Sequence, residues 1–198
     1  MLWVCVFRTP TAKKTCDHAQ SVEQALRSGL EVYSCKDVQS VYKEVKVLKK
    51  GFKTHLGEGF IIQSIPLFHN VECIGFLLEH EEFGKLLFCT DTEKIPYKFK
   101  DVHHILVECN NDYETMIDNM CNNEQYTSAS QNHMNSEDTL EFLKKNYNAN
   151  LQNIVLLHAS KANMNGVKII EDFKKQLCFD NIFLGVAGLE IELNKTEF

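Results

Sequence analysis

Four apolar segments of the chain end abruptly in a side chain that can bind a metal ion. The segments read IIQSIPLFH, KLLFCTD, HHILVE and NIVLLH, and their last residues are His69, Asp91, Glu108 and His158. Imidazoles and carboxylates are groups through which proteins hold zinc and similar divalent ions. Side chains at strand ends gather at one rim of a sheet, where open α/β folds place their ligand sites. We therefore expect these residues to share a site.

Two further candidates, Asp17 and His18, stand just before the first expected helix. Each residue taken alone has an ordinary alternative as a helix cap or a loop residue, so it is the set that indicates a metal site. Four histidines end none of these segments, and we interpret them as surface or strand-edge residues; they are His55, His80, His103 and His104.

The composition is that of one globular domain spanning residues 1–198, since 44% of the residues are hydrophobic and the chain is long enough to bury a core. It contains 21 Lys and Arg against 27 Asp and Glu, a formal net charge of −6. This balance argues against duplex nucleic acid as a partner, while a small anion in a local pocket is compatible with it.

No apolar run reaches the roughly 18 residues of a membrane helix, so no membrane partner is expected. The first residues place apolar side chains before lysines, the reverse of a signal peptide, which indicates a cytoplasmic protein. The chain has eight cysteines and no CxxC motif. Because Cys5, Cys73, Cys89 and Cys109 lie in apolar runs, we interpret them as reduced core residues.

Apolar strand-like segments alternate with helical ones along the chain, which predicts an α/β fold with helices outside a sheet or a pair of sheets. The expected strands cover residues 2–7, 31–34, 44–48, 59–65, 71–79, 85–88, 104–107 and 153–157, with two more between 182 and 193. The expected helices cover 18–28, 36–42, part of 110–134, a segment from 135 or 136 with Leu140, Leu143 and Tyr147 on its apolar face, and a segment from 165 with Ile170, Phe173 and Leu177.

Three stretches of the chain resemble the metallo-β-lactamase superfamily. They are GFLLEHEEFGKLLFCTDTEKIPYKFKDVHHILVECN, NHMNSEDTLEFLK and IVLLHASKANMNG, and the resemblance runs from about residue 11 to residue 193. It is nearest to the small single-domain hydrolases of bacteria and phages, a group that includes phage cyclic-nucleotide phosphodiesterases directed against Pycsar immunity. The resemblance implies an αββα sandwich with a metal cleft at one sheet edge. It also implies that the first sheet is incomplete at the N-terminus, or that Met1 is an internal start.

The family's first signature, HxHxDH, corresponds to the segment KKTCDH in this chain. Lys13 and Thr15 occupy the positions of the first two histidines, whereas Asp17 and His18 are retained. By the same resemblance His69 matches the next metal ligand, Asp91 the bridging carboxylate and His158 the last histidine.

The resemblance therefore implies one damaged and one intact metal position. The first position keeps His69 and a share of Asp91, and two protein ligands do not hold zinc firmly. The second keeps Asp17, His18, Asp91 and His158, a set that suits Zn²⁺ or Mn²⁺. We expect one ion or none. Four protein ligands in a tetrahedron would leave no open position for water, so the ion would be structural unless Asp91 binds weakly or the site expands.

Two further roles follow from the resemblance. His133, in the NHM segment, approaches the cleft and would act with Asp17 in catalysis, as the general acid for the leaving oxygen. Glu108 would support a ligand histidine. Alternatively, Lys13 takes the place of the missing ion and binds a phosphate oxygen, with His69 and His133 donating to the same anion.

Three interpretations stay open at this point. The first is a metal-dependent hydrolase with a single-metal site, acting on a phosphodiester or a cyclic nucleotide. The second is a catalytically inactive protein that binds a nucleotide-like anion as a sponge or sensor, and the third is a degenerate, truncated copy. The expected partners are a small anionic ligand such as a nucleotide and a second copy in a homodimer, in the cytoplasm of a bacterium or a phage-infected host cell.

Overall fold

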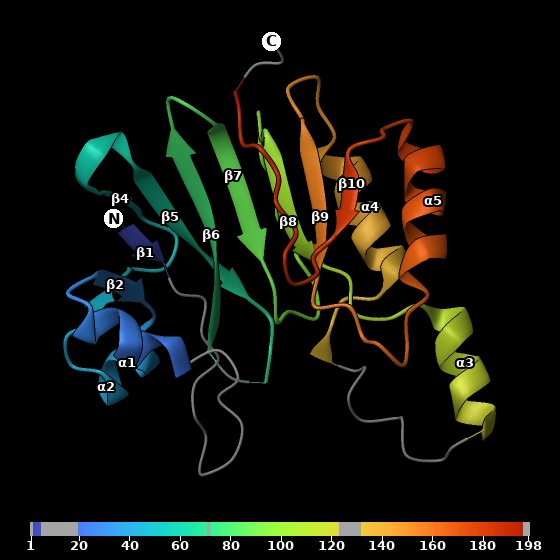
Figure 1. Ribbon diagram of the computed structural model, residues 1–198, viewed down its shortest axis with the longest axis horizontal. Helices are drawn as coiled ribbons and strands as arrows, with labels where there is room; N and C mark the ends of the chain where they lie inside the picture. Colours follow the sequence, from blue (N-terminus) through green and yellow to red (C-terminus); the bar gives the residue numbers. More distant parts are fainter. Residues whose placement is uncertain (1, 5–19, 71, 123–131, 196–198) are drawn as a thin grey trace.

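The computed structural model describes residues 2–4, 20–70, 72–122 and 132–195, which form two β-sheets with helices on their outer faces (Figure 1). The small sheet has the order β1-β2-β3 and the large sheet the order β10-β9-β8-β7-β6-β5-β4. The small-sheet strands are β1 (Leu2–Val4), β2 (Glu31–Ser34) and β3 (Lys46–Val47). The large-sheet strands are β4 (Lys53–His55), β5 (Ile61–Leu67), β6 (Cys73–His80), β7 (Gly84–Cys89), β8 (His104–Glu108), β9 (Asn153–Leu157) and β10 (Ile182–Leu184).

The large sheet changes character at β7. Strands β4 to β7 are antiparallel neighbours, whereas β7, β8, β9 and β10 run parallel to one another. Because parallel neighbours share their direction, the carboxyl ends of these four strands lie along one edge of the sheet. Three of the four metal-competent segment ends found in the sequence, those at Asp91, Glu108 and His158, follow or close strands of this parallel half.

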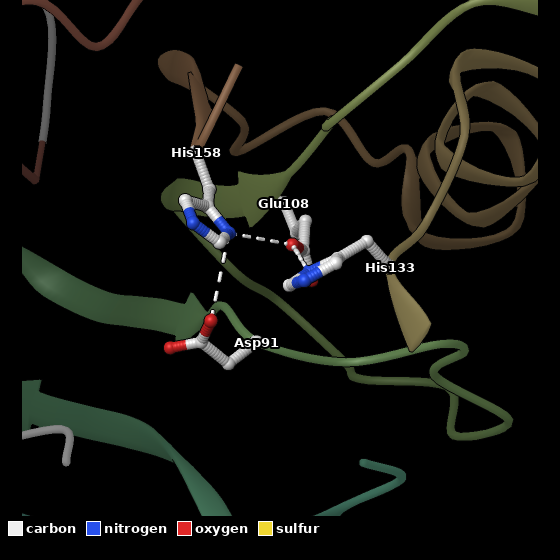
Figure 2. A group of neighbouring side chains, drawn as sticks. All are labelled: Asp91, Glu108, His133 and His158. Atoms are coloured by element: carbon white, nitrogen blue, oxygen red, sulfur yellow. Dashed lines mark hydrogen bonds and ion pairs between the residues drawn. The ribbon is translucent and has the colours of Figure 1, made fainter. Parts of the chain in front are cut away.

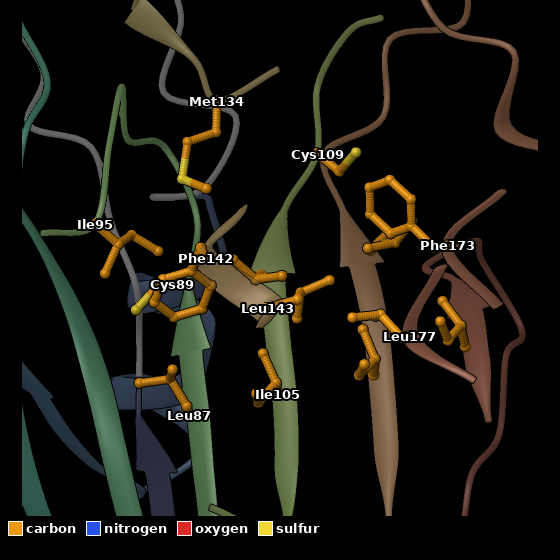
Figure 3. Packing of buried hydrophobic residues seen from close by; sticks show 14 of the residues in the cluster. Leu87, Cys89, Ile95, Ile105, Cys109, Met134, Phe142, Leu143, Phe173 and Leu177 are labelled. Atoms are coloured by element: carbon orange, nitrogen blue, oxygen red, sulfur yellow. The ribbon is translucent and has the colours of Figure 1, made fainter. Parts of the chain in front are cut away.

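The main core lies between the parallel half of the sheet and two helices, α4 (Ser136–Asn146) and α5 (Gly166–Leu177). Figure 3 shows Phe142 and Leu143 of α4 facing Leu87 of β7 and Ile105 of β8, and all four side chains are buried. A further helix, α3 (Tyr113–Asn122), lies between β8 and α4 in the sequence. Burial of these large apolar side chains is what fixes the strand ends in place.

A second core joins the small sheet to the antiparallel half of the large one. Val22 of α1 (Gln20–Arg27) and Val38 of α2 (Lys36–Val41) pack in one cluster with Val32 of β2 and with Ile62 and Phe76 of the large sheet. The layers therefore run helix, sheet, sheet, helix, and the αββα sandwich expected from the sequence is confirmed. A 3₁₀ turn, Gly57–Gly59, connects β4 to β5.

The buried free thiols agree with the interpretation of the cysteines where it can be followed. Cys73, Cys89 and Cys109 are buried and unbridged, whereas Cys5 lies outside the described residues. Burial raises the pKa of Cys73 and of Cys109 to about 12, so these thiols stay protonated at neutral pH.

Several details of the sequence interpretation are wrong. Tyr147 is 46% exposed because α4 ends at Asn146, and Phe142 takes the expected place in the core. On α5, Ile169 is the fully buried isoleucine, whereas the expected Ile170 is partly buried and packs against the same core. His103 and His104 are buried rather than at the surface.

The C-terminal segment also differs from the expectation of two strands between 182 and 193. Only β10 forms, and residues 185–195 run without strand structure. They are held over the large sheet by single contacts, in which Asn153 Nδ2 donates to the carbonyl of Glu192 and the Lys195 amide to that of Glu82. Within the described part of the chain, no helix is long and apolar enough to cross a membrane.

Candidate metal centre

Four side chains converge at the carboxyl edge of the parallel strands. Asp91, Glu108, His133 and His158 each offer a ligand atom, and these atoms all lie within 4.8 Å of one another (Figure 2). Asp91 follows β7, Glu108 is the last residue of β8 and His158 follows β9. His133 comes from the segment just before α4. The group therefore joins three adjacent strand ends to the start of a helix.

Glu108 is the hub of this group. Its side chain is fully buried, and one carboxylate oxygen accepts hydrogen bonds from His133 Nδ1 at 2.6 Å and from His158 Nδ1 at 2.8 Å. The other oxygen accepts from the backbone amide of Thr92 at 2.5 Å. Burial raises the pKa of the Glu108 carboxyl, but the hydrogen bonds from His133 and His158 outweigh this effect and hold the pKa below its usual range. Glu108 is therefore ionised in the folded protein.

An ionised carboxylate at Nδ1 fixes how each imidazole is used. With the proton on Nδ1, the lone pair of a neutral imidazole is on Nε2, which is then available to a metal ion or a proton. Carboxylates that hold ligand histidines in this way are a regular part of metal sites. Glu108 serves two histidines at once, His133 and His158, where the sequence suggested support of one.

Asp91 and His158 both adopt left-handed backbone angles, which are uncommon for residues other than glycine. Their φ values are +54° and +58°, in the left-handed region. Such conformations cost about 1–3 kcal/mol each and collect at functional sites. The two side chains face each other, with His158 Nδ1 3.5 Å from Asp91 Oδ1. Asp91 is buried, while the His158 side chain is 37% exposed and so forms the open side of the group.

His69 lies one ring further out. Its ring centroid is 5.2 Å from that of His133, and its Nδ1 lies 3.0 Å from the carbonyl oxygen of Asn132. His133 in turn stands 4.8 Å from the ring of His158. The three imidazoles thus form a row, with His69 beside the four-residue group rather than within it.

The other sequence candidates, Lys13, Thr15, Asp17 and His18, lie outside the described residues. The structure adds positioning groups that the sequence did not single out. Asn110 Nδ2 donates to the carbonyl of His158 at 2.8 Å, and the Asn110 amide donates to the carbonyl of Met134. This asparagine lies two residues after Glu108, the last residue of β8, and that place just beyond a strand-ending acid is the one signal the sequence offered.

The donor set present fits a divalent transition metal. Imidazole nitrogens and a carboxylate suit Zn²⁺, Mn²⁺ or Fe²⁺. The exposed side of His158 gives the group access to solvent. Because Glu108 already accepts three N–H donors, its part is to hold the histidines, which leaves Asp91, His133 and His158 as the possible ligands.

Comparisons with known proteins identify the fold. No family model matches the chain, and no curated protein matches its sequence. Among solved structures, the metallo-β-lactamase fold protein YhfI from Bacillus subtilis is similar with a TM-score of 0.61 at 15% identity, covering 90% of this chain and 74% of that one. Zinc-bound PqqB from Methylobacterium extorquens has a TM-score of 0.63 at 14% identity, covering 90% and 70%. A diphosphatase of the PhnP family has a TM-score of 0.55 at 14% identity, covering 88% and 66%. The chain has the metallo-β-lactamase fold.

Proposed function

We propose that this protein is a metal-dependent hydrolase with a single-metal site, and that its substrate is a phosphodiester or a cyclic nucleotide. The observation that carries the proposal is the buried Glu108 carboxylate, which holds His133 and His158 with Asp91 opposite, at the ligand-binding rim of the fold. The similarity to zinc-bound PqqB and to a diphosphatase supports the same direction.

Asp91 and His158 would hold the ion, together with the sequence candidates Asp17 and His18. When bound, a divalent ion polarises a phosphoryl oxygen and generates a nucleophile from water. The rest of the reaction falls to the protein. The attacking water releases a proton to solvent as its oxygen bonds to phosphorus, the bond to the leaving oxygen breaks, and His133 gives that leaving oxygen a proton from Nε2. The Glu108 carboxylate holds Nδ1 of His133 and so orients Nε2 for this transfer.

The test is metal analysis and hydrolysis measured on the same protein, purified without chelator. We expect about one equivalent of zinc or manganese per chain and turnover of bis-p-nitrophenyl phosphate or a cyclic nucleotide. His158→Ala is expected to lose both the metal and turnover, and His133→Ala to lose turnover but keep the metal. His55→Ala, an exposed histidine of β4, is the matched control. Metal retained in full by His158→Ala would overturn the assignment.

A specific observation favours binding without hydrolysis as the second candidate. Lys13 and Thr15 stand where the resemblance expects two ligand histidines. We expect the double change Lys13→His and Thr15→His to raise metal content toward two equivalents if the local backbone keeps the family's geometry. A folded, metal-free and inactive wild-type protein that binds cyclic nucleotides intact would establish this second function instead.

A further inference from the structure

A basic hollow lies away from the metal centre, on the face of the large sheet that carries α4 and α5. It has a volume of about 410 Å³. Its floor includes Ile65 and Leu77, whose strands also contribute to the main core. Its walls carry four lysines, and these are Lys53, Lys85, Lys98 and Lys100. The volume falls in the range of roughly 300–1,000 Å³ that small-molecule sites occupy.

Strand register explains why charged groups meet there. Glu79 of β6 is the cross-strand partner of Lys85 of β7, and Lys53 of β4 is the partner of Gln63, which in turn pairs with Leu77. Directly opposite residues project to the same face of a sheet, so these side chains share one side. Glu79 is the single acidic residue of the lining, and Lys53 Nζ lies 3.4 Å from it.

The net charge of this hollow has the opposite sign to that of the whole chain. Four lysines and one glutamate give the lining a net charge of +3, while the whole chain carries −6. A concave patch of one sign concentrates ligands of the opposite sign. The hollow is therefore suited to an anion with several negative charges.

An aromatic wall stands beside the lysines. Tyr97 is 36% exposed, and Phe99 meets it edge-on with the ring centroids 6.4 Å apart. Phe99 is anchored, because its amide donates to Asn146 Oδ1 at 2.7 Å and its ring packs at 6.4 Å against Phe142 of the core. The Lys85 ammonium donates to the carbonyl of Lys100 at 3.2 Å and ties the other end of this segment to β7. The wall is thus held in place before any ligand arrives.

We propose that this hollow is a binding site for a nucleoside phosphate, separate from the metal centre. The phosphates lie on Lys98 and Lys100, and the base stacks on the exposed face of Tyr97, since aromatic stacking beside cationic side chains is how proteins hold bases without reading their sequence. Lys85 lies near the start of β7 and Asp91 beyond its end, about 20 Å apart at 3.3 Å per residue. The proposal stands whether or not the metal centre hydrolyses anything.

The test is calorimetric titration of the full-length protein, in buffer with EDTA, with three probes that separate charge from stacking. ATP carries both features, inorganic tripolyphosphate only the charge and adenosine only the ring. We expect ATP to bind at least tenfold more tightly than either of the other two. Lys98→Ala with Lys100→Ala is expected to weaken ATP and tripolyphosphate at least tenfold. Tyr97→Ala is expected to weaken ATP to the level of tripolyphosphate and to leave tripolyphosphate unchanged.

Two controls decide between this site and others. Lys43→Ala with Lys175→Ala removes two exposed lysines outside the hollow and is expected to leave all three affinities unchanged. His158→Ala is expected to keep ATP binding. The proposal is overturned if ATP does not bind, if Tyr97→Ala has no effect, or if His158→Ala abolishes binding while the lysine pair can be removed without loss.

Discussion

At the scale of single residues, the central fact is that one buried carboxylate serves two imidazoles. Glu108 keeps the Nδ1 atoms of His133 and His158 occupied, so that Nε2 is the nitrogen each can offer to a metal ion. The side chain is short and fully enclosed, so neither histidine can turn without breaking a charge-assisted hydrogen bond. The fixed orientation of His133 and His158 therefore depends on Glu108.

We therefore expect Glu108→Gln to weaken metal binding by about 10- to 100-fold, the usual cost of losing a carboxylate behind a ligand histidine. The amide keeps the size of the side chain but brings donor hydrogens where two N–H groups already point. Competition titration with a chromogenic chelator measures the affinity. Glu93→Gln, an exposed acid nearby in the sequence, is the control and should match the wild type. Equal affinities for both variants would contradict this role of Glu108.

A glycine substitution usually destabilises a protein more than an alanine substitution does, and the left-handed backbone at His158 predicts the opposite order. Both His158→Ala and His158→Gly lose the imidazole, but only glycine adopts a φ of +58° without strain. We expect the glycine variant to exceed the alanine variant by about 1 kcal/mol in free energy of unfolding. Urea denaturation of the two variants side by side measures the difference. An alanine variant that is as stable or more stable would mean that this backbone is not strained.

Much of this site could be predicted from residue types and their places in the sequence. The recurring pattern of an apolar segment ending in His, Asp or Glu predicted that Asp91, Glu108 and His158 would meet, and they do lie together. What the pattern could not supply was the pairing at Glu108, because that depends on His133 being brought across by the fold from a segment without strand or helix periodicity. Nor could it place His69 beside the group rather than in it.

At the scale of elements, the position of His133 depends on how α4 begins. Asn135 is the N-cap, and its side chain accepts a hydrogen bond from the Asp138 amide. Asn111 forms a bridge to Asn135 and accepts from the Ser136 amide, which joins the helix start to the segment after β8. The cap therefore fixes both a helix and the loop that delivers His133.

We expect Asn135→Ala to lower the free energy of unfolding by about 1 kcal/mol, as loss of an N-cap usually does. It should also slow hydrolysis of bis-p-nitrophenyl phosphate, because His133 lies two residues before the cap. Asn165→Ala removes the corresponding cap of α5, whose side chain accepts from the Lys168 amide, and should cost similar stability without slowing hydrolysis. The same activity in both variants would show that the cap of α4 does not position His133.

Elements with strong local signals were predicted well. The strand at 153–157 and the helix capped by Asn165 match the structure, and Gly29, with a φ of +74°, follows α1 as a left-handed glycine after its end. The expectation failed where a segment is apolar but unpaired. Leu189, Ile191 and Leu193 alternate as they would in a strand. The segment nevertheless runs across the large sheet without pairing with a strand, and it is held by isolated contacts such as that of Glu192 with Asn153.

At the scale of the whole molecule, buried histidines outside the site link stability to pH. Burial lowers the pKa of His104 below its ordinary value, and Asn153 Nδ2 lies 3.0 Å from its Nδ1. The unfolded chain then takes up a proton at a higher pH than the folded one. The contribution of the neutral, buried His104 to the free energy of unfolding is therefore fully present above about pH 6.5, the ordinary pKa of histidine. It is lost as the pH falls from there toward the lower pKa of the folded state.

We expect the wild type to lose more free energy of unfolding than His104→Gln when the pH is lowered from about 7.5 to about 5.5. Urea denaturation at both pH values gives the two differences. His55→Gln, at an exposed position, should lose as much as the wild type. Parallel losses in the wild type and His104→Gln would show that this histidine does not contribute to the pH dependence.

The change of the large sheet at β7 also bears on the order in which the protein folds. Strands β4 to β7 are joined by short connections, whereas β8 to β9 is bridged by residues 109–152. Closing short loops costs less chain entropy, so we expect the antiparallel strands to form early and the parallel strands to join them late. Asp91, Glu108 and His158 are brought together only by that late step. The metal ligands are therefore not assembled in the early intermediate. A metal ion binds only after the parallel strands have paired, and it stabilises the sheet without directing its formation.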